Sequence, residues 1–276
     1  MNKKFTELLT IYIIASVFLY FFAKEGTTYA DPSLLMMIRY LISGLILFSI
    51  SKKFVINKNV LLLSVFTTVS TLFWGYGLVY VSPAVSAVLS YTMPLFSLIF
   101  ANAMLKEKAT LLEITGLIIG FLGIGIYGYP LVKGFTKIGV VLTIINAIFW
   151  ALFSIYYRKL SNYDPISLNA TQFLLGSLFM GIVSIFTSYK DFYFYWNVKL
   201  LESIIYISTI GGAFQFLVWN YMLRLERVNR VTMLAYIVPI GTTIAQAFLF
   251  KKIPNIIEIF GLFVIIIGVI ISRYKK

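Results

Sequence analysis

The sequence predicts an all-α membrane protein in which ten transmembrane helices form two inverted five-helix repeats. Hydrophobic residues make up 60% of the 276 residues and charged residues 12%, and the mean hydropathy is +0.92. A soluble domain of this length cannot bury so much apolar surface. Apolar runs of about 20 residues, the length that a helix needs to cross a bilayer, recur along the chain. One long stretch of the chain also occurs twice.

Ten apolar runs are predicted as membrane spans, and short links connect them. The first run follows a short basic segment, Met1–Lys4. It is too long for the apolar core of a signal peptide, so we expect it to remain as the first span. The predicted spans cover residues 5–23, 33–51, 60–80, 84–105, 111–129, 137–157, 167–187, 201–223, 230–250 and 255–272.

The repeated stretch covers residues 74–123 and 219–268, which align without a gap at a shift of 145 positions. A gapless match over tryptophan, proline and glycine indicates an internal repeat. The earlier spans match less closely, through residues 30–34 and 163–167. The identical pairs include Trp74/Trp219, Tyr76/Tyr221, Tyr91/Tyr236, Pro94/Pro239, Lys106/Lys251, Glu113/Glu258, Gly116/Gly261 and Gly123/Gly268.

Each predicted repeat has five spans, with residues 1–132 in the first repeat and residues 133–276 in the second. Because five is an odd number, the second repeat enters the membrane from the opposite side, and the two repeats are inverted. Inverted repeats are typical of secondary transporters, which bind substrate near the middle of the bilayer between the repeats. The repeat therefore predicts a binding site between the two halves.

The basic residues predict the orientation of the chain. With the N-terminus in the cytoplasm, cytoplasmic segments hold fifteen lysines and arginines and external segments hold seven, while Arg39 lies within a span. This bias predicts a multi-pass protein of the cell membrane with both termini in the cytoplasm. Because the net charge of +13 resides mainly in short loops, we expect the lipid bilayer, and not nucleic acid, as the partner of these residues.

The absent residue types exclude several kinds of chemistry. The sequence has no cysteine and no histidine, which excludes disulfides, thiol nucleophiles and histidine-based acid–base catalysis. None of the ten acidic residues falls in the middle of a predicted span, so proton coupling through a buried acid is not supported. We expect no metal and no cofactor.

Short motifs in both halves resemble the drug/metabolite transporter superfamily, specifically its EamA-type group of ten-helix carriers. The motifs are Phe73-Trp74-Gly75-Tyr76-Gly77-Leu78, Met93-Pro94, Leu105-Lys106-Glu107, Arg158-Lys159-Leu160-Ser161, Leu217-Val218-Trp219-Asn220-Tyr221-Met222-Leu223 and Val238-Pro239, together with Arg39. Their order and spacing carry the resemblance over nearly the whole chain. It implies export of amino acids or related metabolites. The group usually has an acidic residue after the fourth and ninth spans, but Lys252 stands where the second would be, which argues against a symmetric pair of loop carboxylates.

Polar and aromatic side chains at helical spacing predict the substrate site. Tyr12, Ser16 and Tyr20 share one face of the first span, and Asn146 and Trp150 share a face of the sixth. Such side chains face a cavity or a partner helix, because lipid offers them no hydrogen bonds; the alternatives are ordinary helix contacts and aromatic belts. The predicted cavity lies among spans 1, 3, 4, 6, 8 and 9, and its predicted substrate-binding residues are Ser16, Tyr20, Ser70, Trp74, Tyr91, Asn146, Trp150, Ser154, Gln215, Trp219 and Tyr236.

Three further features of the spans have a predicted role. Pro94 and Pro239 lie near the middle of the fourth and ninth spans, where proline bends a helix and forms either a hinge beside the site or a static kink. Arg39 snorkels to the membrane surface, holds carbonyls at a helix contact, or contacts the substrate. Glycines on the fifth and tenth spans predict close helix packing, in a monomer or a homodimer; they are Gly116, Gly120, Gly123, Gly261 and Gly268.

The leading functional hypothesis is a secondary carrier that moves a small metabolite, an amino acid or a related compound, outward by alternating access. The alternatives are a carrier of the same fold for drugs and organic cations, which aromatic rings bind through cation–π contacts, or for nucleotide sugars. An integral-membrane enzyme is disfavoured because the aspartates Asp31, Asp164 and Asp191 are scattered and catalysis needs convergent groups. A channel is disfavoured because no ring of filter residues is visible.

Overall fold

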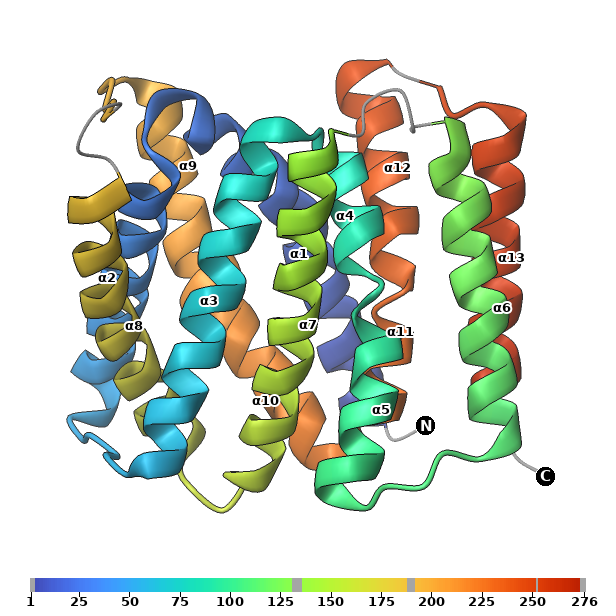
Figure 1. Ribbon diagram of the computed structural model, residues 1–276, viewed down its shortest axis with the longest axis horizontal. Helices are drawn as coiled ribbons and strands as arrows, with labels where there is room; N and C mark the ends of the chain where they lie inside the picture. Colours follow the sequence, from blue (N-terminus) through green and yellow to red (C-terminus); the bar gives the residue numbers. More distant parts are fainter. Residues whose placement is uncertain (1–2, 131–135, 188–191, 252, 274–276) are drawn as a thin grey trace.

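Helices account for nearly all of the chain that the computed structural model describes, which is residues 3–130, 136–187, 192–251 and 253–273. Figure 1 shows them as an upright bundle with the two ends of the chain at the same end of it. The elements are α1 (Lys3–Tyr29), α2 (Pro32–Ser51), α3 (Lys58–Tyr80), α4 (Pro83–Ser90), α5 (Met93–Leu105), α6 (Leu111–Gly128), α7 (Lys137–Lys159), α8 (Pro165–Thr187), α9 (Val198–Ser208), the π-helical segment η2 (Thr209–Phe214), α10 (Gln215–Leu225), α11 (Val228–Leu234), α12 (Ile237–Phe250) and α13 (Ile256–Arg273).

The helices confirm an all-α membrane fold. Within the described residues, nine helical segments are long and apolar enough to cross a membrane, and a shorter apolar helix at Ile256–Ser272 stands at the tenth predicted position. The first span is longer than predicted, since α1 continues to Tyr29. Its last turns are stabilised because the Lys24 ammonium donates to the carbonyls of Leu78 and Val79 at the end of α3.

The fourth and ninth spans are each broken in the middle. α4 ends at Ser90 and α5 begins at Met93, with Pro94 in its first turn. In the ninth span, α11 ends at Leu234 and α12 begins at Ile237, two residues before Pro239. The predicted bends are therefore complete interruptions, because proline has no N–H to continue the helical ladder and is best tolerated in a first turn.

The eighth span contains a π-helical segment, which the pattern of apolar residues does not predict. Residues Thr209–Phe214 join α9 to α10. In a π-helix the hydrogen bonds shift by one residue, so the register of the carbonyls changes and groups become available to side chains. Two side chains of α2 bind backbone carbonyls here. Ser43 Oγ donates to the Ser208 carbonyl at 2.7 Å, and the Arg39 guanidinium donates to the carbonyls of Ile207 and Gly211.

The contacts between spans follow the order of the repeat. The second span packs on the seventh (α2 on α8), the fifth on the tenth (α6 on α13) and the fourth on the ninth (α4 on α12, α5 on α11), while contact of α3 with α7 is matched by contact of α1 with α9 and α10. If each span of the first half is exchanged with its counterpart five spans later, the same set of span pairs is obtained. Lys106 and Lys251, which align in the repeat, both end their helices in the left-handed region, with φ of 56° and 53°.

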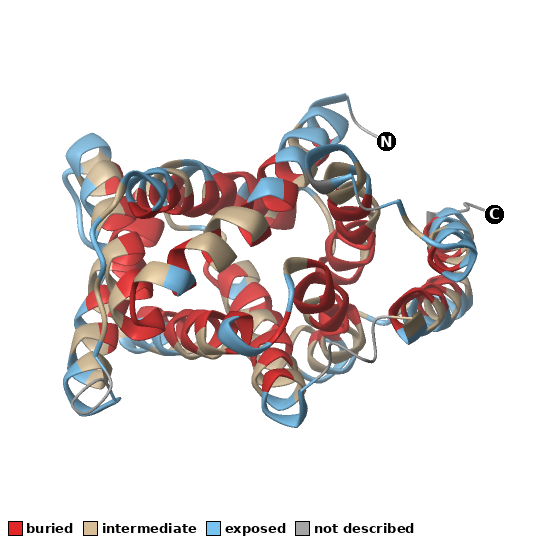
Figure 2. Ribbon diagram, turned by 90° about the horizontal axis from the view of Figure 1, so that it is seen from above, coloured by how far each residue is buried: buried red, intermediate tan, exposed pale blue. Residues whose placement is uncertain are grey.

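Glycines bring α6 and α13 into backbone contact within one chain. A Cβ added at Gly116 would lie 2.6 Å from the backbone nitrogen of Ser272, and one added at Gly123 would lie 2.6 Å from that of Ile265. The glycine stripe is thus used inside the monomer. Seen from above, the helix pair that carries the C-terminus stands at one side of the bundle (Figure 2).

Ion pairs tie the two halves together at one end of the bundle. Glu113 of α6 caps its own helix through Thr110, and its buried carboxylate pairs with Arg227 and with Arg230, whose Nε lies 3.1 Å away. The nearby Glu107 accepts a hydrogen bond from the Val228 N–H. Partial burial raises the pKa of the Glu107 carboxyl, although Arg158 and Arg227 act in the opposite direction.

Replacing Glu113 by glutamine is expected to lower the free energy of unfolding by about 2 kcal/mol. Glutamine keeps the helix cap but removes the charge that the two arginines share. Glu258→Gln is the matched control, because Glu258 caps α13 through Asn255 and forms no ion pair among the described residues. Thermal unfolding in detergent measures both; equal shifts would show that the ion pairs contribute nothing.

Candidate functional site

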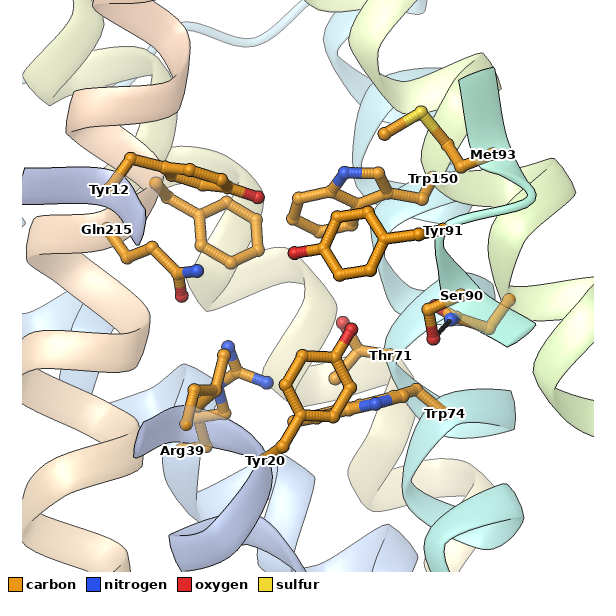
Figure 3. A pocket seen from close by; sticks show the side chains of 13 residues that line it. Tyr12, Tyr20, Arg39, Thr71, Trp74, Ser90, Tyr91, Met93, Trp150 and Gln215 are labelled. Carbon is orange, nitrogen blue, oxygen red and sulfur yellow. Dashed lines mark hydrogen bonds between the residues drawn. The ribbon is translucent and has the colours of Figure 1, made fainter. Parts of the chain in front are cut away.

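A pocket lies in the core of the bundle between the two halves of the chain. Side chains from the first half and from the second half of the chain line it (Figure 3). Most of these residues lie near the middle of their spans. Its walls come from α1, α2, α3, α4, α5, α7 and α10 and from the break before α5. The lining residues are Tyr12, Leu19, Tyr20, Arg39, Thr71, Trp74, Ser90, Tyr91, Met93, Asn146, Trp150, Gln215 and Phe216.

A hydrogen-bonded chain of polar groups fixes one wall of the pocket. Ser70 Oγ donates to Asn146 Oδ1 at 2.8 Å, and Asn146 Nδ2 donates to Ser90 Oγ at 3.0 Å. These residues link α3, α7 and the end of α4. Ser90 directly precedes the break in the fourth span. The hydrogen bond to Ser90 therefore fixes the backbone next to Tyr91, which projects into the pocket (Figure 3).

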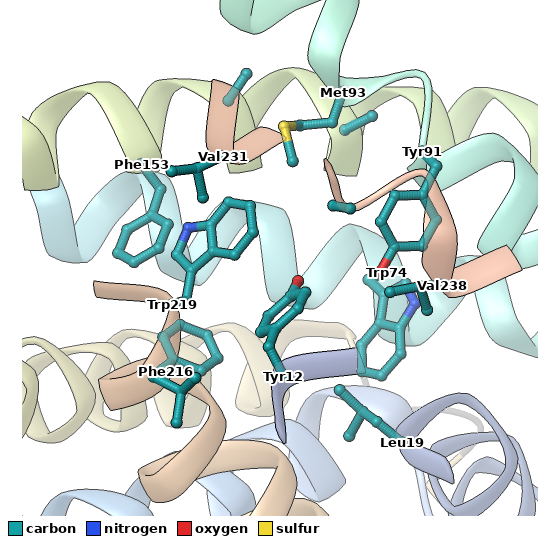
Figure 4. Packing of buried hydrophobic residues seen from close by; sticks show 14 of the residues in the cluster. Tyr12, Leu19, Trp74, Tyr91, Met93, Phe153, Phe216, Trp219, Val231 and Val238 are labelled. Atoms are coloured by element: carbon teal, nitrogen blue, oxygen red, sulfur yellow. The ribbon is translucent and has the colours of Figure 1, made fainter. Parts of the chain in front are cut away.

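Aromatic rings form most of the remaining wall. The Tyr20 ring meets the Trp74 ring edge to face, with centroids 5.6 Å apart, and Trp150 meets Phe216 in the same manner at 5.0 Å. Figure 4 shows the buried rings around Tyr12, which packs on Trp219 at 4.8 Å. Such contacts hold large side chains in defined positions, so the wall is ordered around the pocket.

Two buried polar side chains of the pocket have hydrogen-bonding groups left over, Arg39 and Gln215. Arg39, only 2% exposed, donates from Nε to the Ile207 carbonyl at 3.1 Å and from Nη2 to the Gly211 carbonyl at 2.8 Å. Gln215 Nε2 donates to Ser16 Oγ at 2.6 Å, whereas Gln215 Oε1 is buried without a hydrogen-bond partner. Buried polar atoms are nearly always paired, so an unpaired acceptor at a pocket marks a place for a ligand donor.

The structure brings six of the eleven sequence-predicted residues to the pocket: Tyr20, Trp74, Tyr91, Asn146, Trp150 and Gln215. Three serines stand behind the wall as hydrogen-bond partners: Ser16 for Gln215, Ser70 for Asn146, and Ser154 for the Trp219 indole N–H at 3.1 Å. Trp219 is fully buried behind Tyr12. Tyr236 turns away toward α6, where its ring packs on Gly120.

Seven lining residues were not among the predicted site residues. Tyr12 and Thr71 stood beside predicted positions on the same helix faces, and Ser90 precedes Tyr91, so helical spacing and adjacency give a signal for them. Leu19, Met93 and Phe216 are apolar residues among many, and nothing in the sequence separates them. Of the three predicted roles of Arg39, the structure confirms that it binds carbonyls at a helix contact. It also lines the pocket, and contact with a substrate stays a prediction.

The two described aspartates are used at helix ends, and Asp191 lies outside the described residues. Asp31 caps α2 through the Ser33 and Leu34 N–H groups, and Asp164 accepts from the Ser167 N–H at 2.8 Å at the start of α8. Partial burial opposes the change, but the hydrogen bonds from Ser167 lower the pKa of the Asp164 carboxyl. Within the described ranges, no group of three or more His, Cys, Asp or Glu side chains is placed to hold a metal ion.

Comparison with known proteins gives a consistent result. The model of the EamA-like transporter family matches residues 7–129 and again residues 137–274. A protein of Acidianus ambivalens named "Uncharacterized transporter in sor 3'region" is 45% identical over 241 residues, which is 87% of this chain and 93% of that protein. An uncharacterized transporter of Bacillus subtilis, YvbV, is 25% identical over 265 residues, or 92% of this chain and 86% of that protein.

Two more distant similarities extend the comparison. A Rickettsia prowazekii protein named S-adenosylmethionine uptake transporter is 24% identical over 207 residues, 74% of this chain and 67% of its own. A solved crystal structure superposes with a TM-score of 0.82 at 16% identity, covering 99% of this chain and 97% of the other. At that identity the structural match speaks for the fold alone.

Proposed function

The chain belongs to the EamA-like transporter family, and from this premise we propose that it is a secondary carrier of a small metabolite that works by alternating access. That it is a membrane transporter of small molecules follows from the family. The observation that carries the finer proposal is the pocket, which residues of both halves enclose and in which Gln215 Oε1 has no partner. A pocket in the middle of the bundle that contains an unpaired acceptor is suited to bind a solute that must enter from either side.

The arrangement of the spans supports two inverted repeats, residues 1–132 and 133–276. The family model matches each half separately. In Figure 1, α1 starts at the end of the bundle where both termini lie, and α7 starts at the opposite end. The contacts between spans keep the same pattern when the halves are exchanged. Two related halves of opposite orientation allow two conformations of similar energy, which alternating access requires.

The ion-paired end of the bundle supports a closed state at that side. Glu113 in the first half binds Arg227 and Arg230 in the second, and the repeat places Ser82 and Val85 at the corresponding positions of the other side. Transport then consists of breaking these pairs while the opposite end closes. We place this end, which carries both termini, in the cytoplasm of the cell, since the basic residues gather there.

An amino acid or a derivative of one is the proposed substrate, moved outward. A distant relative is named for uptake of S-adenosylmethionine, which is itself an amino-acid derivative. That name supports the class of substrate, whereas the outward direction rests on the resemblance to EamA-type exporters alone. The pocket combines a guanidinium, amides, hydroxyls and aromatic rings, and so it matches a solute with a polar head and an apolar body. An enzymatic function has less support, because Asp31 and Asp164 are engaged as helix caps.

Purified protein in liposomes is expected to carry out saturable counterflow of labelled amino acids and metabolites, and Gln215→Ala is expected to slow it about tenfold. Transport slows because alanine removes the unpaired acceptor Oε1 and also the hydrogen bond between Gln215 and Ser16. Gln246→Ala is the control, since Gln246 is a glutamine of the ninth span outside the lining of this pocket. Trp219→Ala is expected to slow transport as well, because Tyr12 and Trp150 rest on that ring. Wild-type rates in both Gln215→Ala and Trp219→Ala would remove these residues from the site.

A further inference from the structure

We propose that Arg39 recognises an anionic group, a carboxylate, on the transported molecule, and that the pocket rejects organic cations that lack a carboxylate. This inference rests on the proposed carrier function and names the chemical class of its substrate. It is carried by three features of the pocket: the fixed position of the guanidinium, the absence of a carboxylate beside it in the described residues, and the rings that already hold it.

The guanidinium is held in place by backbone carbonyls. Arg39 extends from α2 to the junction of α9 and the π-helical segment, where the carbonyls of Ile207 in α9 and of Gly211 in the π-helical segment accept its Nε and Nη2 hydrogens. Ser43, one turn further along α2, donates to the carbonyl of Ser208, the last residue of α9. The guanidinium has five N–H groups, and Nη1 has only the Met36 sulfur at 3.9 Å. Donors thus remain on the edge that faces the pocket.

The positive charge has no acidic partner in the described structure. The ion pairs there involve Glu25, Glu113 and Glu226, and no aspartate or glutamate lines the pocket. The chain between Asp31 and Glu107 contains no acidic residue at all. A buried charge is unfavourable unless it is paired, so a bound carboxylate supplies the counter-charge that the protein lacks.

The aromatic faces near Arg39 are already occupied by a cation. Its guanidinium carbon lies 5.3 Å from the centroid of the Trp74 ring and 5.8 Å from that of Phe216. A second cation bound to these rings would lie beside the first, and like charges in a site of low dielectric repel strongly. Rings that would otherwise attract an organic cation therefore stabilise Arg39 and leave the pocket positive.

The neighbouring groups define the rest of the substrate. Figure 3 shows the Gln215 amide and the Arg39 guanidinium facing the same part of the pocket. The unpaired Gln215 Oε1 suits a hydroxyl or amino donor next to the carboxylate. Tyr20, Tyr91 and Trp150 offer ring surface to an apolar body. The class is a small carboxylic acid with an apolar or aromatic side chain.

Counterflow into proteoliposomes, with a metabolite library sorted by charge, tests the inference on the unmodified protein. The library includes matched phenyl compounds: 3-phenylpropionate, phenylalanine, 3-phenylpropanol and 2-phenylethylamine. We expect every solute that is exchanged saturably to carry a carboxylate, and each carboxylate to compete at least about tenfold better than its matched alcohol or amine. Saturable exchange of cations or neutral solutes in preference to carboxylates would overturn the inference and leave the carrier function intact. An absence of saturable exchange for the whole library would defeat the carrier function, and the inference with it.

Variants of Arg39 give a second measurement. Because Arg39 also holds the π-helical segment, the readout is the ratio of carboxylate to alcohol competition, which does not depend on how much protein is folded. Arg39→Gln is expected to bring this ratio to about one, and Arg39→Lys to keep a reduced preference for carboxylates. Arg158→Gln is the matched control, since Arg158 also binds two carbonyls, those of Leu223 and Arg224, but does not line the pocket. An unchanged ratio in Arg39→Gln would refute the role of Arg39.

Discussion

Gly268→Ala is expected to lower the free energy of unfolding by about 3 kcal/mol. A Cβ at Gly268 would lie 2.6 Å from the Gly116 carbonyl oxygen and 2.8 Å from the Gly120 Cα. Both are backbone atoms of α6, so no side chain can move to make room, and the two helices must separate along their length. The α6–α13 packing is the most extensive contact that either helix makes, so separating the two helices weakens most of what holds them in the bundle.

A matched control lies on the same helix. A Cβ added at Gly125 of α6 meets no atom within 4 Å, so Gly125→Ala is expected to leave stability unchanged or to raise it slightly, because alanine favours the helix. Thermal unfolding of both variants in nanodiscs measures the difference. Equal melting temperatures for Gly268→Ala and the unmodified protein would show that α6 and α13 do not pack as described.

The double variant Pro94→Ala/Pro239→Ala is expected to slow transport about a hundredfold without lowering stability. Each proline stands just after the break in its span. Alanine restores an N–H that can bind a carbonyl in the preceding turn, so that the two short helices join into one. Tyr91, which lies in the first break and lines the pocket, is then turned from its position, and the bend that the proposed alternating access requires is lost.

The control for the hinge prediction is another proline of the same span. Pro83 occupies the first turn of α4, where a missing N–H removes no helical hydrogen bond, so Pro83→Ala is expected to transport at nearly the normal rate. Counterflow rates and thermal unfolding are measured together. Normal transport by the double variant would identify the breaks as static kinks.

Much of the fold could be predicted from the chain because a membrane imposes few choices. A helix that crosses the bilayer must be apolar over a fixed length, so the spans follow from composition, and their bounds agree with the structure to within a few residues except at Tyr29. The repeat was visible because tryptophan, proline and glycine mark positions where only one residue type serves. The break in each proline-containing span followed from the missing N–H.

The candidate site is less predictable than the fold. Helical spacing shows which side chains share a face of one helix, but it does not show which residues of other helices that face contacts. Trp74 and Trp219 align in the repeat, yet one lines the pocket and the other is buried behind Tyr12. Tyr91 and Tyr236 also align, but Tyr236 packs on Gly120. The same sequence position meets different neighbours in the two halves, so equal residues have unequal roles.

The class of protein, the number and order of the spans and the doubled Trp–Tyr–Pro–Gly pattern follow from the amino-acid sequence, because each depends on local hydrophobicity and on backbone chemistry. Three features emerge in the folded chain alone: the glycines of α6 and α13 pack within one chain, the eighth span has a π-helical segment, and Arg39 reaches that segment and faces the pocket. These features depend on contacts between residues more than 100 positions apart, such as Arg39 with Ile207 and Gly211. Packing of distant helices, and not periodicity along one helix, selects which buried groups meet.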